Sequence, residues 1–169
     1  VVINDIDESA LEEATRELED ASGRVVPVVG DASQPEDMER LIETTVDRFG
    51  GLDILVNNVG IAGPTKPAEE ISPEEFLRTL EVNLGGHFNA VRAAIPHLRE
   101  GDDGRIVCIS SMSGKRPLRD RTPYTTSKMG VIGFVRTLAI ELAADDITVN
   151  AICPGSVEGP RIERVIEGQ

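Results

Sequence analysis

Short apolar runs alternate with amphipathic stretches along the whole chain. Continuous apolar runs, such as RIVCIS at 105–110, are typical of strands that are buried on both faces. Longer stretches repeat apolar residues at helical spacing. The pattern predicts strands at 1–5, 24–31, 52–58, 104–111 and 147–155, and helices at 9–21, 35–50, 72–98 and 123–143.

Local signals place several helix ends. Ser9, with Glu12 three residues later, predicts an N-cap and capping box for the first helix. Gly50 predicts the end of the second helix. Asn83 lies in the middle of the 72–98 helix, where an asparagine competes for backbone hydrogen bonds, so we expect a kink there.

The regular alternation of strands and helices predicts an α/β fold. Right-handed crossovers between parallel strands give a doubly wound, Rossmann-type sheet with helices on both faces. The length of 169 residues fits one domain, spanning 1–169. Because the chain starts with Val1 inside a predicted strand, we expect it to be a fragment of a longer gene product.

Composition excludes several classes of protein. A formal net charge of −13 argues against nucleic-acid binding. There is no apolar run long enough to span a membrane and no signal peptide, so a cytoplasmic protein is expected. Cys108 and Cys153 lie in apolar segments and are interpreted as buried small side chains. With only 2 histidines as well, no metal site is predicted.

The residues that follow each strand are the candidates for ligand binding, because ligands of such sheets bind beyond the carboxyl ends of the strands. They are small, polar or glycine. They comprise Asn4–Asp5, Gly30–Asp31, Asn57 to Gly60, Ser110 to Gly114 and Pro154 to Gly159.

Tyr124, the single tyrosine, has Lys128 four residues later, on the same helical face. A phenol ionises near pH 10, and a nearby ammonium favours the phenolate, which makes tyrosine usable as an acid or base. Chance could also supply this spacing. Ser111, at the end of a strand, could bind a substrate oxygen, whereas Ser110 and Ser113 are interpreted as turn residues. Asn83 alone could be a tolerated surface residue.

Together these motifs resemble the classical short-chain dehydrogenase/reductase (SDR) family. The matching motifs are NNVG at 57–60, Asn83, ISSMSG with Ser111, YTTSK at 124–128, and NAICPG at 150–155. They occur in the order and spacing of the family. The resemblance implies an NAD(P)-dependent oxidoreductase that transfers a hydride to or from a secondary alcohol or carbonyl compound, such as a 3-oxoacyl group or a sugar.

The resemblance also implies a catalytic role for four residues. Tyr124 would exchange a proton with the substrate oxygen. Lys128 would favour the phenolate and hold the nicotinamide ribose. Ser111 would orient the substrate, and Asn83 would hold a water in a proton relay.

The implied cofactor is NAD, with NADP less favoured. Asp5 would bind the adenine ribose and repel a 2′-phosphate, although a solvated loop acid is the alternative for this residue. Asp31 and Ala32 would flank the adenine. The other implied cofactor contacts are Asn57, Val59 and Gly60 on the adenosine side, and Pro154, Gly155 and Val157 at the nicotinamide.

Two departures from the family pattern are visible. The glycine-rich turn that the family carries at its N-terminus is absent, as is its C-terminal segment, so we expect a domain truncated at both ends. Gly159 stands where the family often has threonine. A non-catalytic member and an inactive truncated product therefore stay as alternatives. The family also implies a homodimer or homotetramer formed through the two long helices.

Overall fold

The computed structural model describes residues 1–22 and 24–156. All five predicted strands and the four predicted helical regions are present, with ends shifted by a few residues. The strands are β1 (Val2–Asp5), β2 (Val26–Val29), β3 (Ile54–Asn57), β4 (Arg105–Ile109) and β5 (Thr148–Ile152). The helices are α1 (Glu8–Ser22), α2 (Pro35–Phe49), α3 (Pro73–Leu80), α4 (Gly86–Leu98) and α5 (Thr122–Glu141). Short 3₁₀ turns are η1 (Ala68–Glu70), η3 (Met112–Gly114) and η4 (Ala143–Asp145).

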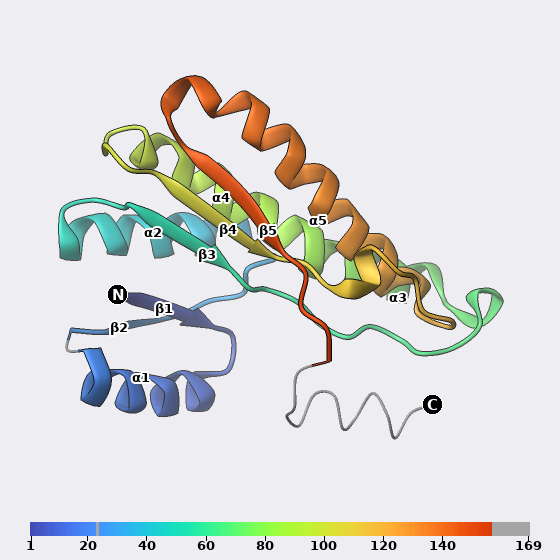
Figure 1. Ribbon diagram of the computed structural model, residues 1–169. Coiled ribbons are helices and arrows are strands. Elements are labelled where there is room, and N and C mark those ends of the chain that lie inside the picture. Colours follow the sequence, from blue (N-terminus) through green and yellow to red (C-terminus); the bar gives the residue numbers. More distant parts are fainter. Residues whose placement is uncertain (23, 157–169) are drawn as a thin grey trace.

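All strand pairs are parallel, as predicted, but the described strands form two sheets. One sheet contains β1 and β2, and the other has the order β3, β4, β5. Figure 1 shows the two sheets one below the other. β1 and β3 are not hydrogen-bonded to each other, so the single sheet expected from the sequence is divided at this point.

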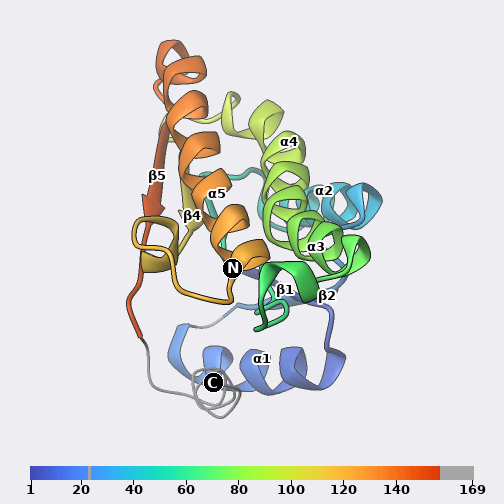
Figure 2. The ribbon, with the colours of Figure 1, turned by 90° about the vertical axis from the view of Figure 1, so that its right-hand side faces the viewer.

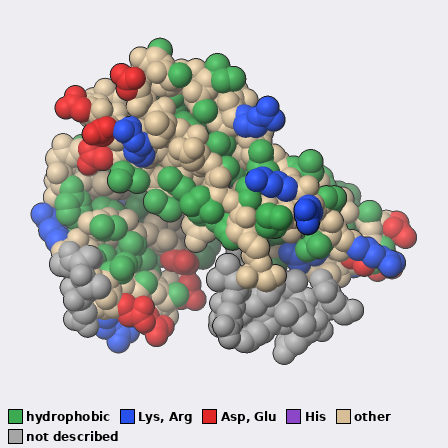
Figure 3. Space-filling model, in the orientation of Figure 1, with side chains coloured by type: hydrophobic (Ala, Val, Ile, Leu, Met, Phe, Trp, Pro, Cys, Tyr) green, Lys and Arg blue, Asp and Glu red, His purple; other side chains and the backbone are tan. Residues whose placement is uncertain are grey.

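Helices lie on both sides of the strands. Figures 1 and 2 show α2, α4 and α5 on one face of the larger sheet, while β1 and β2 lie between α1 and α2. The core fills the space between the larger sheet and its helices, where Ala94, Leu98, Ile106 and Val131 are 0% exposed. Figure 3 views the other face of this sheet, where hydrophobic side chains are visible over the strands. Ile54 on β3 is 60% exposed.

Two of the helix ends test the local predictions. Gly50 ends α2 in the left-handed conformation, with φ of 83°, as predicted. The N-cap prediction for α1 was wrong, because Asp7 and not Ser9 caps the helix. The Asp7 carboxylate accepts hydrogen bonds from the backbone N–H groups of Ser9 and Ala10, at 3.0 and 3.1 Å. A carboxylate one residue before the helix competes well for these N–H groups.

The long helical region is interrupted at Asn83, as expected. The interruption is a π turn, η2 (Glu81–Gly85), between α3 and α4. Such turns insert one extra residue into a helix and are frequent at functional sites. Ser72 and Glu75 form a reciprocal capping box at the start of α3. None of the described helices is long and apolar enough to cross a membrane.

Candidate active site

Lys128 lies in the first half of α5 and is 4% exposed. Its Nζ atom donates a hydrogen bond to the backbone oxygen of Ile109, at the end of β4, over 2.9 Å. The same atom lies 5.9 Å from the centroid of the Tyr124 ring. The Tyr124 side chain is partly exposed. The structure therefore places Tyr124 and Lys128 on one face of α5, with the Lys128 ammonium between the helix and the end of β4.

The side chain of Asn83 is fully buried and joins three segments of the chain. Its Oδ1 atom accepts a hydrogen bond from the backbone N–H of Ile61 (2.7 Å), and its Nδ2 atom donates to the oxygen of Ile61 (3.0 Å). Nδ2 also donates to Oγ of Ser127 (3.1 Å), which donates to the backbone oxygen of Tyr124 (2.7 Å). The amide thus holds the loop after β3 against the start of α5, and it is not a surface asparagine.

Two glycines let the backbone approach this cluster. A Cβ atom added to Gly60 would lie 3.2 Å from Oδ1 of Asn83 and 3.3 Å from Nζ of Lys128. One added to Gly114 would lie 2.8 Å from the backbone oxygen of Lys128. Glycine is needed at 114 because the atom it approaches belongs to the backbone and cannot rotate away.

Ser111 lies two residues after the end of β4 and is the N-cap of η3. Its Oγ atom accepts a hydrogen bond from the backbone N–H of Ser113 over 3.1 Å, and the residue is partly exposed. Ser110 has a more specific role than the turn residue expected. It is 4% exposed, and its hydroxyl donates to the backbone oxygen of Lys128 over 2.8 Å.

Sequence reasoning missed two residues of this site, Ser127 and Arg121, and it assigned a third, Ser110, only to a turn. Each one contacts a predicted residue directly. Ser127 immediately precedes Lys128, and Arg121 lies three residues before Tyr124. Helical spacing does not identify Arg121, because it lies before α5 and its φ of −121° and ψ of 30° are not helical.

The two acids predicted for adenosine binding differ in their surroundings. Asp5, at the end of β1, is exposed, and Oδ1 accepts a hydrogen bond from the N–H of Asp7 over 2.9 Å. The Asp31 carboxylate accepts bonds from the N–H and the hydroxyl of Ser33, both at 2.8 Å, and Arg78 lies 3.5 Å away. Partial burial opposes ionisation of Asp31, but the Ser33 bonds and the Arg78 charge outweigh it and lower the pKa of this carboxyl.

Ala32 and Val59 come together around Gly86, whose added Cβ would lie 3.3 Å from Ala32 and 3.1 Å from Val59. Asn57 is 3% exposed, and its side chain donates to the backbone oxygen of His87 over 3.1 Å. The Asn57 amide therefore joins β3 to α4 and faces away from solvent.

The loop after β5 contacts η3, next to Ser111. The backbone oxygen of Pro154 accepts a hydrogen bond from the N–H of Met112 over 2.8 Å. Gly155 is exposed. Val157 and Gly159, which the sequence also singled out, lie outside the described residues.

His87 is a buried polar residue that is close enough to Lys128 to be affected by its charge. His87 is 0% exposed, and neither ring nitrogen has a hydrogen-bond partner among the described residues. Burial, and then the charge of Lys128, lower the pKa of His87 to about 4, so the ring is neutral. Burial raises the pKa of the Cys108 thiol to about 11, against the opposing effect of Lys128. Both cysteines are free, and no group of three potential metal ligands occurs in the described part of the chain.

Comparison with known proteins identifies the family to which this chain belongs. A family model described as short chain dehydrogenase matches residues 1–168. The chain belongs to this family. Relatives include D-beta-hydroxybutyrate dehydrogenase from Rhizobium meliloti, 37% identical over 149 residues, which cover 88% of this chain and 57% of the relative. Another is 3-oxoacyl-[acyl-carrier-protein] reductase FabG from Thermotoga maritima, 35% identical over 169 residues, covering 99% of this chain and 68% of the relative.

Solved structures of the family share the fold. Levodione reductase superposes with a TM-score of 0.95 at 31% identity, and the match covers 99% of this SDR chain and 66% of the reductase. NAD+-bound xylitol dehydrogenase has a TM-score of 0.95 at 31% identity, with coverage of 98% and 64%. The chain thus spans about two thirds of the length of these proteins, and the α/β Rossmann-type fold predicted from the sequence is confirmed.

Proposed function

We propose that the protein is an oxidoreductase that transfers a hydride between NAD(P) and a secondary alcohol or carbonyl compound. The observation that carries this proposal is that Gly60, after β3, closely approaches Asn83 and Lys128, while Lys128 binds the end of β4 and approaches the Tyr124 ring. The names of the relatives favour the same class of reaction, since they are dehydrogenases and reductases of hydroxyl or carbonyl compounds. A 3-oxoacyl or hydroxyacyl compound, or a sugar alcohol, is the proposed substrate type.

Tyr124 is proposed as the acid and base. In carbonyl reduction its hydroxyl donates a proton to the substrate oxygen while the carbon receives a hydride, and in alcohol oxidation the proton moves back. A bound nicotinamide supplies or accepts the hydride. Lys128 is proposed to favour the phenolate by its charge, because an ammonium close to a phenol stabilises the ionised form. Ser111 is proposed to donate a hydrogen bond to the substrate oxygen.

The Asn83 side chain is fully used by Ile61 and Ser127. If this residue holds a water in a proton relay, as proposed from the family, the backbone oxygen in the π turn is the group that does so. The side chain then has a separate function, which is to fix the loop after β3.

The residues fit NAD at two places. Gly60 leaves the space next to Asn83 and Lys128 that a side chain would fill. Asp5 presents an exposed carboxylate at the end of β1, where it can accept hydrogen bonds from ribose hydroxyls and repel a 2′-phosphate. Ile6 follows where a basic residue would favour the phosphate. We therefore propose NAD over NADP.

The test is oxidation of NADH and NADPH with a panel of carbonyl compounds: 3-oxoacyl thioesters, 3-oxo acids and ketoses. Turnover with at least one of them, faster with NADH, is the expected result. Cofactor binding without turnover on any compound would instead favour a non-catalytic member of the family. Absence of both binding and turnover, checked beside far-UV circular dichroism, would favour an inactive product.

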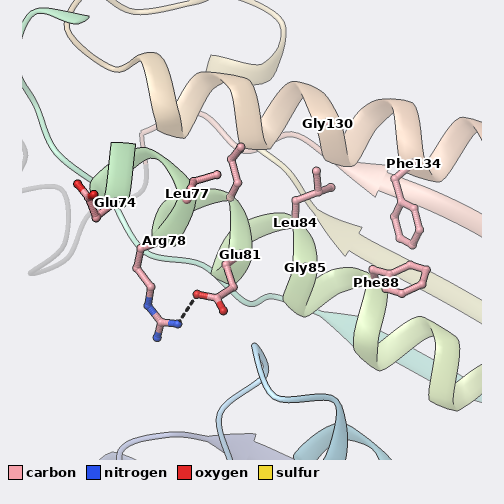
Figure 4. Close-up of a pocket in the computed structure, with 10 residues that line it drawn as sticks. Glu74, Leu77, Arg78, Glu81, Leu84, Gly85, Phe88, Gly130 and Phe134 are labelled. Atoms are coloured by element: carbon pink, nitrogen blue, oxygen red, sulfur yellow. Dashed lines mark hydrogen bonds and ion pairs between the residues drawn. The ribbon is translucent and has the colours of Figure 1, made fainter. Parts of the chain in front are cut away.

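We also propose that the protein forms a homo-oligomer through α3, η2, α4 and α5. Figure 4 shows a groove between these helices, which the rings of Phe88 and Phe134 line side by side. Their centroids are 6.4 Å apart in an edge-on arrangement. Leu77 on α3 and Phe88 on α4 both line this groove and are 62% and 52% exposed, and neighbouring exposed apolar side chains are typical of interaction surfaces.

Light scattering tests the oligomer. Phe88→Asp should convert a dimer or tetramer to a smaller species, because it places a charge in the proposed contact. Leu118→Asp is the matched control, since Leu118 is 53% exposed but lies in the loop before α5. A parent protein that is monomeric at all accessible concentrations would contradict the proposal.

A further inference from the structure

The proposed mechanism leaves one buried cation unused. Arg121 immediately precedes α5 and is 4% exposed, although it belongs to a loop whose other basic residues, Lys115, Arg116 and Arg119, are exposed. Arginine is rarely buried unless specific contacts hold the guanidinium group. The contacts of Arg121 therefore indicate its role in the structure.

Two of these contacts join Arg121 to the loop after β3. Nη1 donates a hydrogen bond to Oγ1 of Thr65 over 2.8 Å, and Nη2 donates to the backbone oxygen of Ala62 over 3.0 Å. Both acceptors are neutral oxygen atoms. Together the two hydrogen bonds fix the plane of the guanidinium group.

The loop that provides these acceptors is itself held firmly. Asn83 binds both backbone groups of Ile61, and the N–H of Lys66 donates to the backbone oxygen of Asp120 over 3.0 Å. Gly63 has φ of 66°, and its added Cβ would lie 2.8 Å from Oγ1 of Thr79. The acceptors of Arg121 are therefore part of a fixed frame.

The guanidinium group lies over the ring of Tyr124. Its Cζ atom is 4.7 Å from the ring centroid, within the range of a cation–π interaction. Lys128 also approaches this ring, with Nζ at 5.9 Å from the centroid. Arg121 immediately precedes α5, and Lys128 follows Tyr124 by one helical turn. Two charged side chains thus contact one tyrosine.

We propose that Arg121 is a positioning residue for Tyr124, in that its guanidinium plane fixes the ring and its charge favours the phenolate. This inference rests on the proposed role of Tyr124 as acid and base. Arginine suits the position because it combines a permanent charge with a planar group that both stacks on a ring and donates two hydrogen bonds. Lysine could supply the charge but not the plane.

Direct titration of Tyr124 tests the proposal without an activity assay. The chain has 1 tyrosine and 0 tryptophans, so the ultraviolet absorbance of tyrosinate reports this residue alone. Arg121→Gln is expected to move the midpoint of the titration upward by about one pH unit, the order of magnitude for removing a charge near the ring. The matched control is Arg116→Gln, which removes an exposed charge from the same loop and should leave the midpoint unchanged.

Equal midpoints in the parent and Arg121→Gln would overturn the proposal, as would equal shifts in Arg121→Gln and Arg116→Gln. If Arg121→Gln does not fold, Arg121→Lys decides the matter by kinetics. Turnover lower by about threefold or more, with an unchanged cofactor Kd, supports the role of the guanidinium plane. Turnover equal to that of the parent overturns it.

The failure of this inference can be distinguished from failure of the proposed function. If Tyr124 is not the acid and base, Tyr124→Phe retains turnover on the carbonyl panel, whatever the titration shows. If only the role of Arg121 is wrong, Tyr124→Phe is inactive while Arg121→Gln titrates and turns over like the parent.

Discussion

Asn83 and Asp5 were both predicted to serve one cofactor and substrate site, yet their surroundings differ. Asn83 is fully buried and bonds to Ile61 and Ser127, which are 22 and 44 residues away in the sequence. Asp5 is exposed, and its carboxylate accepts a bond from Asp7, two residues away. The region around Tyr124 is thus held by long-range buried contacts, while the end of β1 is held by local contacts at the surface.

This difference indicates where substitutions should act. Buried groups that lose their partners cost far more free energy than exposed ones, because water cannot replace the partner. Changes around Tyr124 should therefore reduce both stability and turnover. Changes at Asp5 should alter only the choice and affinity of the cofactor.

Asn83→Leu is expected to have the largest effect. It removes three hydrogen bonds, two with the N–H and oxygen of Ile61 and one that Oγ of Ser127 accepts, at about 1 kcal/mol or more for each, so unfolding free energy should fall by about 3 kcal/mol. Urea denaturation measures this. The control is Asn58→Ala, an exposed asparagine directly after β3, with an expected change below about 0.5 kcal/mol. Similar losses in both variants would contradict the comparison.

His87 tests the buried region by its pH dependence. Burial, followed by the charge of Lys128, lowers the pKa of His87 to about 4 in the folded protein. The unfolded chain protonates near pH 6.5 and so binds the proton more readily than the native state. Stability from this group is therefore fully present above about pH 6.5 and is lost as the pH falls through 4, by about 3 kcal/mol.

His87→Gln should flatten this part of the stability profile, as measured by urea denaturation between pH 7 and pH 4. His97→Gln, which removes the only other histidine, should retain the profile of the parent. A parent-like slope in His87→Gln would show that other groups cause the acid sensitivity.

Two glycine substitutions give opposite predictions. Gly114→Ala should destabilise the protein by about 2 kcal/mol, because the new Cβ meets the backbone oxygen of Lys128. Gly133→Ala should stabilise it by up to about 1 kcal/mol, since Gly133 lies inside α5 with no atom within 4 Å of the new Cβ. Thermal denaturation separates the two, and shifts of the same sign would refute the packing described around Lys128.

Asp5→Ala should have the smallest effect. We expect about tenfold weaker NADH binding, because the exposed carboxylate would contribute about one hydrogen-bonded contact to the ribose. NADPH binding and the stability of the protein should change little. Calorimetric titration with each cofactor checks this, with Glu8→Gln as a control for loss of a nearby exposed acid. Unaltered NADH affinity in Asp5→Ala would remove the argument for NAD over NADP.

The sequence was sufficient for features that depend on local patterns. Apolar periodicity identified the five strands and the long helical regions of residues 1–22 and 24–156, and the motifs with Asn83, Tyr124 and Lys128 identified residues that the structure brings close together. The N-cap of α1 was assigned wrongly because Ser9 and Asp7 are both good caps, and only the backbone shows which one reaches the free N–H groups.

Other features depend on contacts between distant segments, which a local pattern does not record. The division into two sheets depends on which strands meet, and the buried state of Arg121 depends on Thr65 and Ala62 being close to it. The three bonds of the Asn83 amide likewise require Ile61 and Ser127 to come together. For these residues, tertiary structure was needed to separate a surface group from a buried one.

The central claim is that Tyr124 is the acid and base of the site, and turnover of Tyr124→Phe tests it most directly. The substitution removes only the hydroxyl and keeps the ring that Arg121 and Lys128 approach. We expect turnover on the best carbonyl substrate to fall by about 10²-fold or more, with the NADH Kd unchanged. Turnover within about tenfold of the parent, in a variant that folds and binds NADH normally, would contradict the account.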